Sequence, residues 1–406
     1  MPLRKIRATI SKNVPVRRHP AGRPAETDLK QKGNIMMNHF YTNASNDVQS
    51  TNKLQSISAD IRHVKYLGRT LSYDGILWLA LSGSGIEFLF QGSLLSLLLA
   101  GDDSAGTQMQ EEKARFAVFL DGIRVIDELM TQPETRYTLI DNETPITCHV
   151  RIVKLSEAPM SILGIKELTA DENASCTPAG KRNRKIEFIG DSITCGYGID
   201  DDDPAHPFAT GTEDALKAYA ALTAEALHAD YSLVSYSGHG VISGYTQSNE
   251  KNTDALLPPF YPLVGFSHGT YQTRSVTGAL WDFNDFSPDL IVINLGTNDD
   301  SYCQDIKERQ EEFALSYRQF LEEIRARNPE AVILCTYGLM NERLHPYLDK
   351  AVASFRKQNH DAKIDVLHFP MQTDADGYVV NYHPCMMTHQ KAAWLLTQKI
   401  KTLMNW

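Results

Sequence analysis

From residue 185 to the end of the chain, short apolar runs typical of buried strands alternate with longer segments of helical periodicity. Strands are expected near residues 185–190, 231–236, 289–294, 331–336 and 364–368, and helices over 214–229, 305–327, 345–358 and 389–404. Parallel strands need a crossover connection, and a helix is its usual form. The pattern therefore predicts an α/β domain of three layers, with a parallel sheet between two layers of helices.

Polar motifs follow several of these segments. Gly190-Asp191-Ser192 ends the first strand, Gly296-Thr297-Asn298-Asp299 follows the third, and Asn381-Tyr382-His383-Pro384 stands before the closing helix. Reacting groups of parallel α/β sheets lie at the carboxyl ends of the strands. A serine also needs a nearby base to become a nucleophile at neutral pH. Ser192, Asn298 and His383 are therefore expected to converge on one site.

The order Ser192, Gly238, Asn298, His383 resembles the four named blocks of the SGNH, or GDSL-type, hydrolases, over about residues 185–406. A β-rich segment in front extends the resemblance to the two-domain acetyl esterases of carbohydrate esterase family 2. The resemblance implies that Ser192 is the nucleophile and His383 its base. It also implies an oxyanion hole made by the backbone N–H of Ser192, the backbone N–H of Gly238 and the side-chain amide of Asn298. Gly240 is an alternative to Gly238.

The residue that would orient His383 is left open by the sequence. Most SGNH hydrolases carry an aspartate three residues before the histidine, but this chain has Val380 there. Asn381 stands where some family 2 esterases carry Asp. We expect a Ser192–His383 dyad with a neutral third partner, either the Asn381 amide oxygen or a backbone carbonyl, because the resembled family includes members that work in this way. Two nearby acids remain as alternatives: Asp374 and Asp376.

Three residues beside these motifs are expected to have structural roles. Asp191 and Asp299 are expected to hold loops through hydrogen bonds from side chain to backbone. Cys195 is expected to pack under the loop as a small buried side chain.

Residues 54–168 contain apolar runs near 75–81, 86–90, 94–99, 115–120 and 147–155, separated by turn signals such as Asp121-Gly122. Regularly spaced strands of this kind predict a β-sandwich, and we expect a jelly-roll-like one. The polar stretch 171–184 is interpreted as a linker. The expected organisation is a basic, disordered tail (1–36), a β-sandwich domain (37–170), a linker (171–184) and a catalytic domain (185–406).

An insertion over residues 241–287 has no clear period and is rich in aromatic rings. Long irregular loops in compact domains are usually functional. The rings either attach the insertion to the sheet or together form a stacking surface for sugars. Trp281, and Tyr302 just beyond Asn298, are the candidate substrate contacts. The rings of the insertion are Tyr245, Phe260, Tyr261, Phe266, Tyr271, Trp281, Phe283 and Phe286.

The 406-residue chain carries 50 acidic and 40 basic residues, and nine of the basic residues lie in residues 1–36. The remaining chain is strongly acidic and repels phosphate backbones, so no nucleic-acid partner is expected. No apolar run approaches the ~20 residues that span a bilayer, and no membrane association is expected. The tail lacks the apolar core of a secretory signal, so we expect a cytoplasmic location.

Neither a cofactor nor a metal is expected, because the chain has no phosphate-binding glycine motif and its six cysteines have no zinc-type spacing. The resemblance implies a serine esterase that removes acetyl groups from oligosaccharides derived from xylan or mannan through an acyl-enzyme. One alternative is a lipase- or thioesterase-like enzyme with a broad apolar pocket. Another is a carbohydrate-binding protein whose catalytic centre has decayed. In a third alternative, the β-sandwich binds glycans through an exposed ring such as Trp78 while the second domain catalyses.

Overall fold

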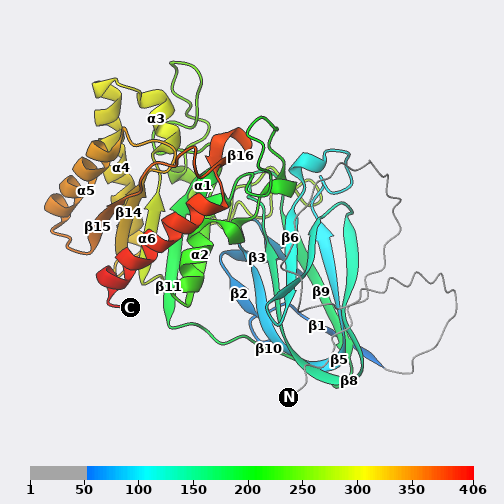
Figure 1. Ribbon diagram of the computed structural model, residues 1–406. Coiled ribbons are helices and arrows are strands. Elements are labelled where there is room, and N and C mark those ends of the chain that lie inside the picture. The colour runs from blue at the N-terminus through cyan, green and yellow to red at the C-terminus, as the bar shows by residue number, and fades with distance from the viewer. Residues whose placement is uncertain (1–52) are drawn as a thin grey trace, which may run out of the picture.

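The computed structural model describes residues 53–406, apart from the side chain of Gln110, as an all-β part joined to an α/β part (Figure 1). The basic tail expected at residues 1–36, and the start of the β domain expected at residue 37, lie outside the described residues.

The N-terminal part is a ten-stranded sheet in the order β3-β4-β9-β5-β8-β6-β7, with β1 on β9, and β2 and β10 on β5. Its strands are β1 (Leu54–Ile57), β2 (Lys65–Leu67), β3 (Thr70–Tyr73), β4 (Ile76–Leu79), β5 (Gly85–Gly101), β6 (Arg115–Leu120), β7 (Ile123–Leu129), β8 (Glu134–Lys154), β9 (Leu163–Asp171) and β10 (Ser175–Pro178). A short 3-10 helix, η1 (Gln110–Glu112), lies before β6. The prediction of a β domain is therefore confirmed.

Strand β5 shows why a break between 86–90 and 94–99 was expected. Phe88 and Phe90 are fully buried while Leu89 between them is exposed, which is the period of two of a strand with one face on the core. At Gly92 the register with β8 shifts. A Cβ on Gly92 would lie 2.7 Å from the Cβ atom of Ala174. The glycine therefore marks a bulge in one long strand, where the sequence had suggested two strands.

The prediction of a linker over residues 171–184 is wrong in its first half. Strand β9 runs to Asp171, and β10 (Ser175–Pro178) pairs antiparallel with β5. Cys176 in β10 is buried in the core of the N-terminal sheet. The polar composition of this stretch hid a short edge strand, because its pairing to β5 depends on backbone hydrogen bonds, which composition does not reveal.

The C-terminal part contains the predicted parallel sheet, in the order β12-β11-β13-β14-β15. Its strands are β11 (Arg184–Gly190), β12 (Ala229–Ser235), β13 (Leu290–Asn294), β14 (Val332–Tyr337) and β15 (Ile364–His368). Alternate residues of β13 enter different cores: Leu290 and Val292 pack with α2 (Tyr219–Ala226) and α6 (Met386–Met404), and Ile291 and Ile293 with α4 (Lys307–Arg327) and α5 (His345–Asn359). Helices therefore cover both faces, as Figure 1 shows.

Shorter elements complete this part. They are α1 (Ser192–Cys195), α3 (Thr297–Cys303), the 3-10 helices η2 (Thr210–Thr212), η3 (Ala215–Lys217), η4 (Pro258–Phe260) and η5 (Val380–Tyr382), and the hairpin strands β16 (Tyr378–Val379) and β17 (His383–Pro384). None of the described helices combines the length and the apolarity needed to cross a membrane.

Two helix starts differ from the prediction. The helix expected from residue 214 begins at Tyr219, because Asp214 caps the short helix η3 by accepting the N–H of Leu216, and Ala218 is extended. The last helix, expected from residue 389, begins at Met386. His389 is therefore buried within α6, where its Nδ1 accepts the N–H of Tyr219 at 3.1 Å.

A buried ion pair joins the two sheets. Arg69, between β2 and β3, is fully buried, and its Nη2 lies 3.1 Å from Oε2 of Glu187 in β11. Its Nη1 donates to the carbonyl oxygens of Tyr261 and Leu263. Trp78 in β4 is also fully buried and packs 4.8 Å from the Tyr271 ring. The alternative in which Trp78 binds glycans at the surface of the sandwich is therefore wrong.

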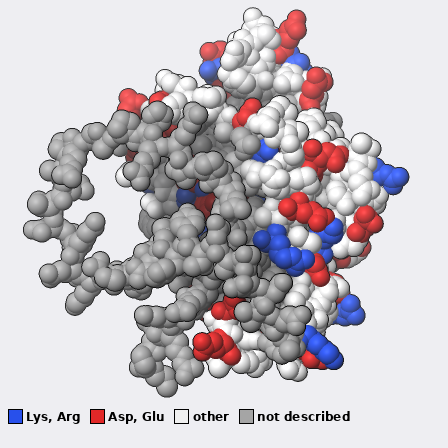
Figure 2. Space-filling model, turned by 90° about the vertical axis from the view of Figure 1, so that its right-hand side faces the viewer, with Lys and Arg blue, Asp and Glu red and all other residues white. Residues whose placement is uncertain are grey.

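Acidic and basic side chains are interspersed on the face of the molecule shown in Figure 2, where that face is not grey. Exposed ion pairs of the N-terminal sheet include Arg136–Glu167 at 2.9 Å and Lys166–Glu134. Each such exposed pair contributes only about 0–1 kcal/mol to stability.

Candidate active site

Ser192 stands at a sharp turn from strand to helix. Strand β11 ends at Gly190 and α1 begins at Ser192, with the Asp191 side chain capping the helix through the N–H of Ile193 at 3.0 Å. A Cβ on Gly190 would lie only 2.0 Å from Oγ1 of Thr194, so this turn requires glycine. The motif Gly190-Asp191-Ser192 thus places one hydroxyl at the carboxyl edge of the sheet.

The structure brings His383 to Ser192 across 191 positions of sequence, with Nε2 of the imidazole 2.9 Å from Oγ of the serine. The Nδ1 atom of His383 faces the carbonyl oxygen of Val380 at 3.2 Å. Because a carbonyl can only accept, Nδ1 carries the proton and Nε2 is free to accept the serine proton. Nucleophile and base therefore have the geometry that nucleophilic catalysis requires.

The structure selects among the partners that the sequence left open for His383. Asp374 accepts the Tyr378 hydroxyl at 2.7 Å, and Asp376 pairs with Lys391. The Asn381 side chain donates its amide to the Tyr197 hydroxyl at 2.9 Å and does not bind the imidazole. The backbone carbonyl of Val380 is the partner, and the alternative of the Asn381 amide oxygen is not what the structure shows.

A strained turn creates this contact. Asn381 and Tyr382 both have left-handed backbones, with φ of 53° and 59°. Asparagine tolerates that conformation, but a tyrosine there costs about 1 kcal/mol or more. The turn lets the carbonyl of Val380 reach the ring three residues later. The ring of Tyr197 stacks on His383 at 4.2 Å, with Phe208 stacked 4.1 Å from Tyr197, so packing also fixes the orientation of the imidazole.

The environment keeps His383 neutral. Burial lowers the pKa of His383 to about 4, and the carbonyls of Val380 and Asn381 only partly oppose this by favouring the protonated ring. At neutral pH the imidazole is therefore unprotonated at Nε2 and can act as a base.

The predicted oxyanion donors face the same cleft. Gly238 has φ of 76°, and its N–H makes no hydrogen bond to any other described residue. Gly240, the alternative, already donates its N–H to the carbonyl of Ala255 at 3.1 Å. The Asn298 amide lies in the cleft with Nδ2 2.9 Å from the carbonyl oxygen of His239. Of the two glycines, the geometry favours Gly238.

Asp191 and Asp299 hold loops, as predicted. Asp299 accepts the N–H groups of Val241, Ile242 and Ser243 at 2.7–3.2 Å and so fixes the segment after Gly238. Burial raises the pKa of Asp191 to about 7 and that of Asp299 to about 6, and the backbone N–H donors oppose the shift in both.

A cleft of about 600 Å³ opens over Ser192. Trp281 and Tyr302, the predicted substrate contacts, lie outside it: Trp281 faces the Arg69 guanidinium, and Tyr302 lies under Arg309 at 4.3 Å. The cleft is lined by Ser192, Tyr197, Gly238, Tyr245, Gln247, Thr297, Asn298, Asp300, Ser301, Met340, Asn341, Asn381, Tyr382 and His383. Sequence reasoning missed Met340 and Asn341. Their place just beyond the carboxyl end of β14 was the signal that could have found them.

Most rings of the insertion pack against the hydrophobic core and are half-buried. Phe260 stacks on Phe266 at 4.3 Å, and Tyr261 is fully buried. Of the predicted ring set, Tyr245 is the member that lines the cleft. The rings therefore do not together line the cleft over Ser192, and several of them attach the insertion to the core of the sheet.

The fold and the site define a class, the serine hydrolases whose nucleophile follows the first parallel strand. Residues 188–391 match the model of the GDSL-like lipase/acylhydrolase family, and the chain belongs to this family. Residues 66–179 match the model "Carbohydrate esterase 2 N-terminal". The chain therefore combines a hydrolase domain of the GDSL-like family with an N-terminal part that is similar to that of the family 2 carbohydrate esterases.

Curated relatives agree with this assignment. The chain is 28% identical over 332 residues to a cellulase/esterase of Acetivibrio thermocellus, covering 80% of this chain and 38% of that protein, so it spans well under half of that relative. It is 26% identical over 377 residues to an acetylxylan esterase/glucomannan deacetylase of Cellvibrio japonicus, covering 92% and 98% of the two chains.

Solved structures show the same fold. An acetyl xylan esterase from the rumen bacterium Butyrivibrio proteoclasticus superposes with a TM-score of 0.77 at 25% identity, covering 87% of this chain and 99% of that one. A family two carbohydrate esterase from Clostridium thermocellum, solved in complex with cellohexaose, gives a TM-score of 0.71 at 27% identity, covering 84% and 99%.

Proposed function

We propose that this protein is a serine esterase that removes O-acetyl groups from plant-type oligosaccharides, derived from xylan or mannan, through an acyl-enzyme intermediate. The observation that carries the proposal is the 2.9 Å contact between Oγ of Ser192 and Nε2 of His383 in an open cleft that Gly238 and Asn298 also line.

The reaction follows from this geometry. Oγ of Ser192 attacks the acetyl carbonyl carbon while Nε2 of His383 takes the hydroxyl proton. The oxyanion that forms is stabilised by the N–H groups of Ser192 and Gly238 and by the Asn298 amide. His383 then gives its proton to the departing sugar oxygen, leaving acetyl-Ser192. Water, activated by the same imidazole, releases acetate and restores the serine.

The lining of the cleft supports short acyl groups on a polar carrier. Among the described residues that form it, Met340 is the one large aliphatic side chain, beside the rings of Tyr197, Tyr245 and Tyr382. A lipase-like site would need an extended apolar pocket for the acyl chain, so the lipase alternative is disfavoured. The intact contact between Ser192 and His383 likewise disfavours a decayed binding protein.

The relatives support the acetyl group and the carbohydrate. One is named an acetylxylan esterase/glucomannan deacetylase, and a structural neighbour is an acetyl xylan esterase. The acetylated oligosaccharide itself is part of the proposal, as is the particular hydroxyl that is deacetylated.

The N-terminal sheet is also part of the proposal, as a jelly-roll-like sandwich. Its longest strands, β5 and β8, pair with each other through two register shifts, and β5 pairs with β9 at one end and with β2 and β10 at the other. Shifts of this kind bend strands so that one strand can serve two packed layers.

The test is acetate release from acetylated xylo- and manno-oligosaccharides, alongside p-nitrophenyl esters of increasing chain length, for the wild type and Ser192→Ala. We expect turnover limited to acetyl and other short esters and abolished by the alanine. Turnover that rises with acyl length would favour the lipase alternative. Oligosaccharide binding without turnover of any ester would favour the binding protein.

A further inference from the structure

Glu157, in the loop between β8 and β9, is a carboxylate of the N-terminal part that reaches the catalytic part. Its side chain is fully buried, and Oε2 accepts the backbone N–H of Ser237 at 2.8 Å. Ser237 directly precedes Gly238, which lines the cleft and whose N–H has no partner among the described residues. The contact therefore lies one residue from a proposed oxyanion donor.

The peptide between Ser237 and Gly238 sets the direction of that donor. Its carbonyl oxygen, on Ser237, is bound by Nδ1 of His239 at 2.9 Å, and its N–H belongs to Gly238. Gly238 has no side chain and a positive φ, and an added Cβ would meet nothing within 4 Å, so packing at this glycine does not lock the peptide. Glu157 and His239 hold the two polar groups of Ser237, while the N–H of Tyr245 holds the carbonyl oxygen of Gly238 on the far side at 2.8 Å.

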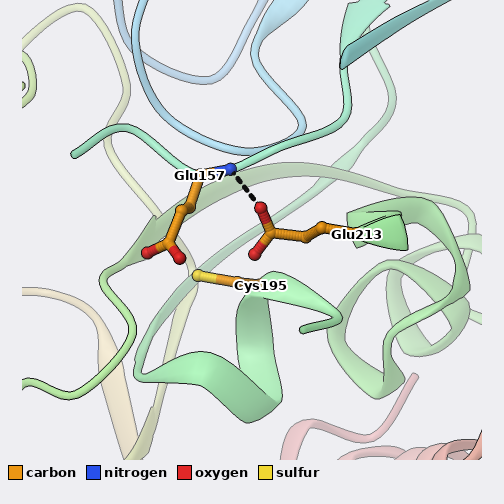
Figure 3. A group of neighbouring side chains, drawn as sticks. All are labelled: Glu157, Cys195 and Glu213. Atoms are coloured by element: carbon orange, nitrogen blue, oxygen red, sulfur yellow. Dashed lines mark hydrogen bonds between the residues drawn. The ribbon is translucent and has the colours of Figure 1, made fainter. Parts of the chain in front are cut away.

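Glu157 is itself held by buried groups. Oε2 of Glu213, just after η2, accepts the N–H of Glu157 at 2.7 Å, which is the dashed line in Figure 3. Nζ of Lys154 donates to the carbonyl oxygen of Glu157 at 2.8 Å and to that of Ser156 at 2.6 Å. Lys154, Glu157 and Glu213 are all fully buried.

This arrangement costs stability. Burial raises the pKa of Glu157 and of Glu213, and the Glu157 charge raises that of Glu213 further. The second oxygen of each carboxylate, Oε1, has no hydrogen-bond partner among the described residues. An apolar residue at position 157 would avoid these costs, so the carboxylate is explained by the N–H that it binds.

A metal is the other use that such side chains suggest. Within the described chain, Glu157, Cys195 and Glu213 form one group whose donor atoms lie within 4.8 Å of one another (Figure 3). The donors do not favour a cation: each Oε2 is already bound to a backbone N–H, burial keeps the Cys195 thiol protonated by raising its pKa, and the Lys154 ammonium is nearby.

We propose that Glu157 is a positioning residue of the esterase, which fixes the Ser237–Gly238 peptide and thereby aims the Gly238 N–H at the oxyanion. The N-terminal part of the chain then completes the active site of the C-terminal part. This inference rests on the proposed esterase function.

The test compares three variants of the full chain. Glu157→Met removes the acceptor but keeps the approximate size, and we expect kcat for an acetyl ester to fall about 10- to 100-fold with KM within about 3-fold, because a misaimed donor acts mainly on the transition state. Glu157→Gln keeps an acceptor oxygen and should recover most of the lost kcat. If Glu157→Met does not fold, Glu157→Asp, which withdraws the carboxylate by one methylene, takes its place with the same expectation.

A second readout separates positioning from stability. A boronic acid forms a tetrahedral adduct with Ser192 that places an oxygen where the oxyanion forms, so its inhibition constant should rise in parallel with the fall in kcat. Asp171→Leu is the matched control, because it likewise removes a carboxylate acceptor and keeps the approximate size, and Asp171 also accepts backbone N–H groups, those of Ser93 and Leu94 at 2.8 Å, but within the N-terminal sheet. It should lower thermal stability without changing kcat or the inhibition constant.

The outcomes are distinct. If Glu157→Met or its substitute keeps kcat within about 3-fold of an active wild type, the positioning role is overturned. It is also overturned if Asp171→Leu loses as much kcat as the Glu157 variant. If the wild type hydrolyses no ester, the proposed function fails first, and the inference fails with it.

Discussion

The Nδ1 atom of His383 lies 3.2 Å from the carbonyl oxygen of Val380, the residue at which most SGNH hydrolases carry their aspartate. The residue at this position therefore still orients the histidine, but it does so through its backbone carbonyl and not through a side-chain carboxylate. A carbonyl fixes the tautomer and the orientation of the imidazole as an aspartate would. It carries only a partial charge, so it stabilises the imidazolium less.

The surroundings of the Val380 side chain are unsuited to a charged carboxylate. It is fully buried and packs against Gly198, where an added Cβ would lie 2.6 Å from the Cβ of Val380. We therefore expect Val380→Asp to bury an unpaired carboxylate, lowering the free energy of unfolding by about 3 kcal/mol or more without raising kcat. Urea unfolding and ester hydrolysis, with Val380→Ala as the control for lost packing, measure both. A gain in kcat would show that an aspartate side chain can reach His383.

The activity should persist into acid. Because burial lowers the pKa of His383 to about 4, we expect kcat/KM to be level from neutral pH down to about 5 and then to fall about tenfold per pH unit, as Nε2 becomes protonated and cannot act as a base. The initial rates at each pH check this. An acid limb centred near the ordinary histidine value of about 6.5 would contradict it.

A loss of activity caused by unfolding must be distinguished from the acid limb that protonation of His383 produces. Burial also lowers the pKa of His389 to about 3. Both histidines therefore bind protons more weakly in the folded chain than in the unfolded chain. The free energy of unfolding consequently decreases as the pH falls below about 6.5, because the unfolded chain then takes up protons that the folded chain does not. Tryptophan fluorescence recorded with each rate shows whether the chain is still folded.

Asn298 should matter for the transition state more than for binding. Its amide faces the cleft and is held by the carbonyl of His239 at 2.9 Å. We expect Asn298→Ala to lower kcat about 10²- to 10³-fold with little change in KM, as for the loss of one oxyanion donor. Asn298→Asp, which has the same shape and no donor, should lose at least as much. A loss of kcat below about tenfold in both variants would show that Asn298 is not an oxyanion donor.

The ion pair between the two sheets should control stability. Glu187 is almost fully buried and accepts from Arg69, from the hydroxyl of Ser232 at 3.1 Å and from that of Tyr261 at 3.1 Å. Arg69→Met leaves that charge buried without its cation, and we expect a loss of about 3–5 kcal/mol in the free energy of unfolding. Adding Glu187→Gln should restore part of it. A double-mutant cycle by urea unfolding measures the coupling, and additive losses would contradict a direct pair.

The alternation of strands and helices after residue 185 predicted the parallel sheet because each buried strand is a short apolar run and each crossover needs a helix. The motifs at Ser192, Asn298 and His383 predicted a common site because parallel strands end at one edge. By contrast, only composition indicated Trp281 as a substrate contact. An aromatic ring packs against a protein core and a sugar with the same apolar face, so composition could not place it beside Arg69.

The sequence by itself determined the class of fold, the nucleophile and the base, since these depend on periodicity and on residue types at strand ends, which are local properties. Only the tertiary structure decided that the Val380 carbonyl orients His383 and that Glu157 reaches Ser237 from another sheet. It also decided that Gly238, and not Gly240, has an N–H without a partner among the residues described. These contacts depend on backbone direction and on approaches between distant segments. Any residue has a carbonyl and most have an N–H, so their identities alone do not reveal which ones meet.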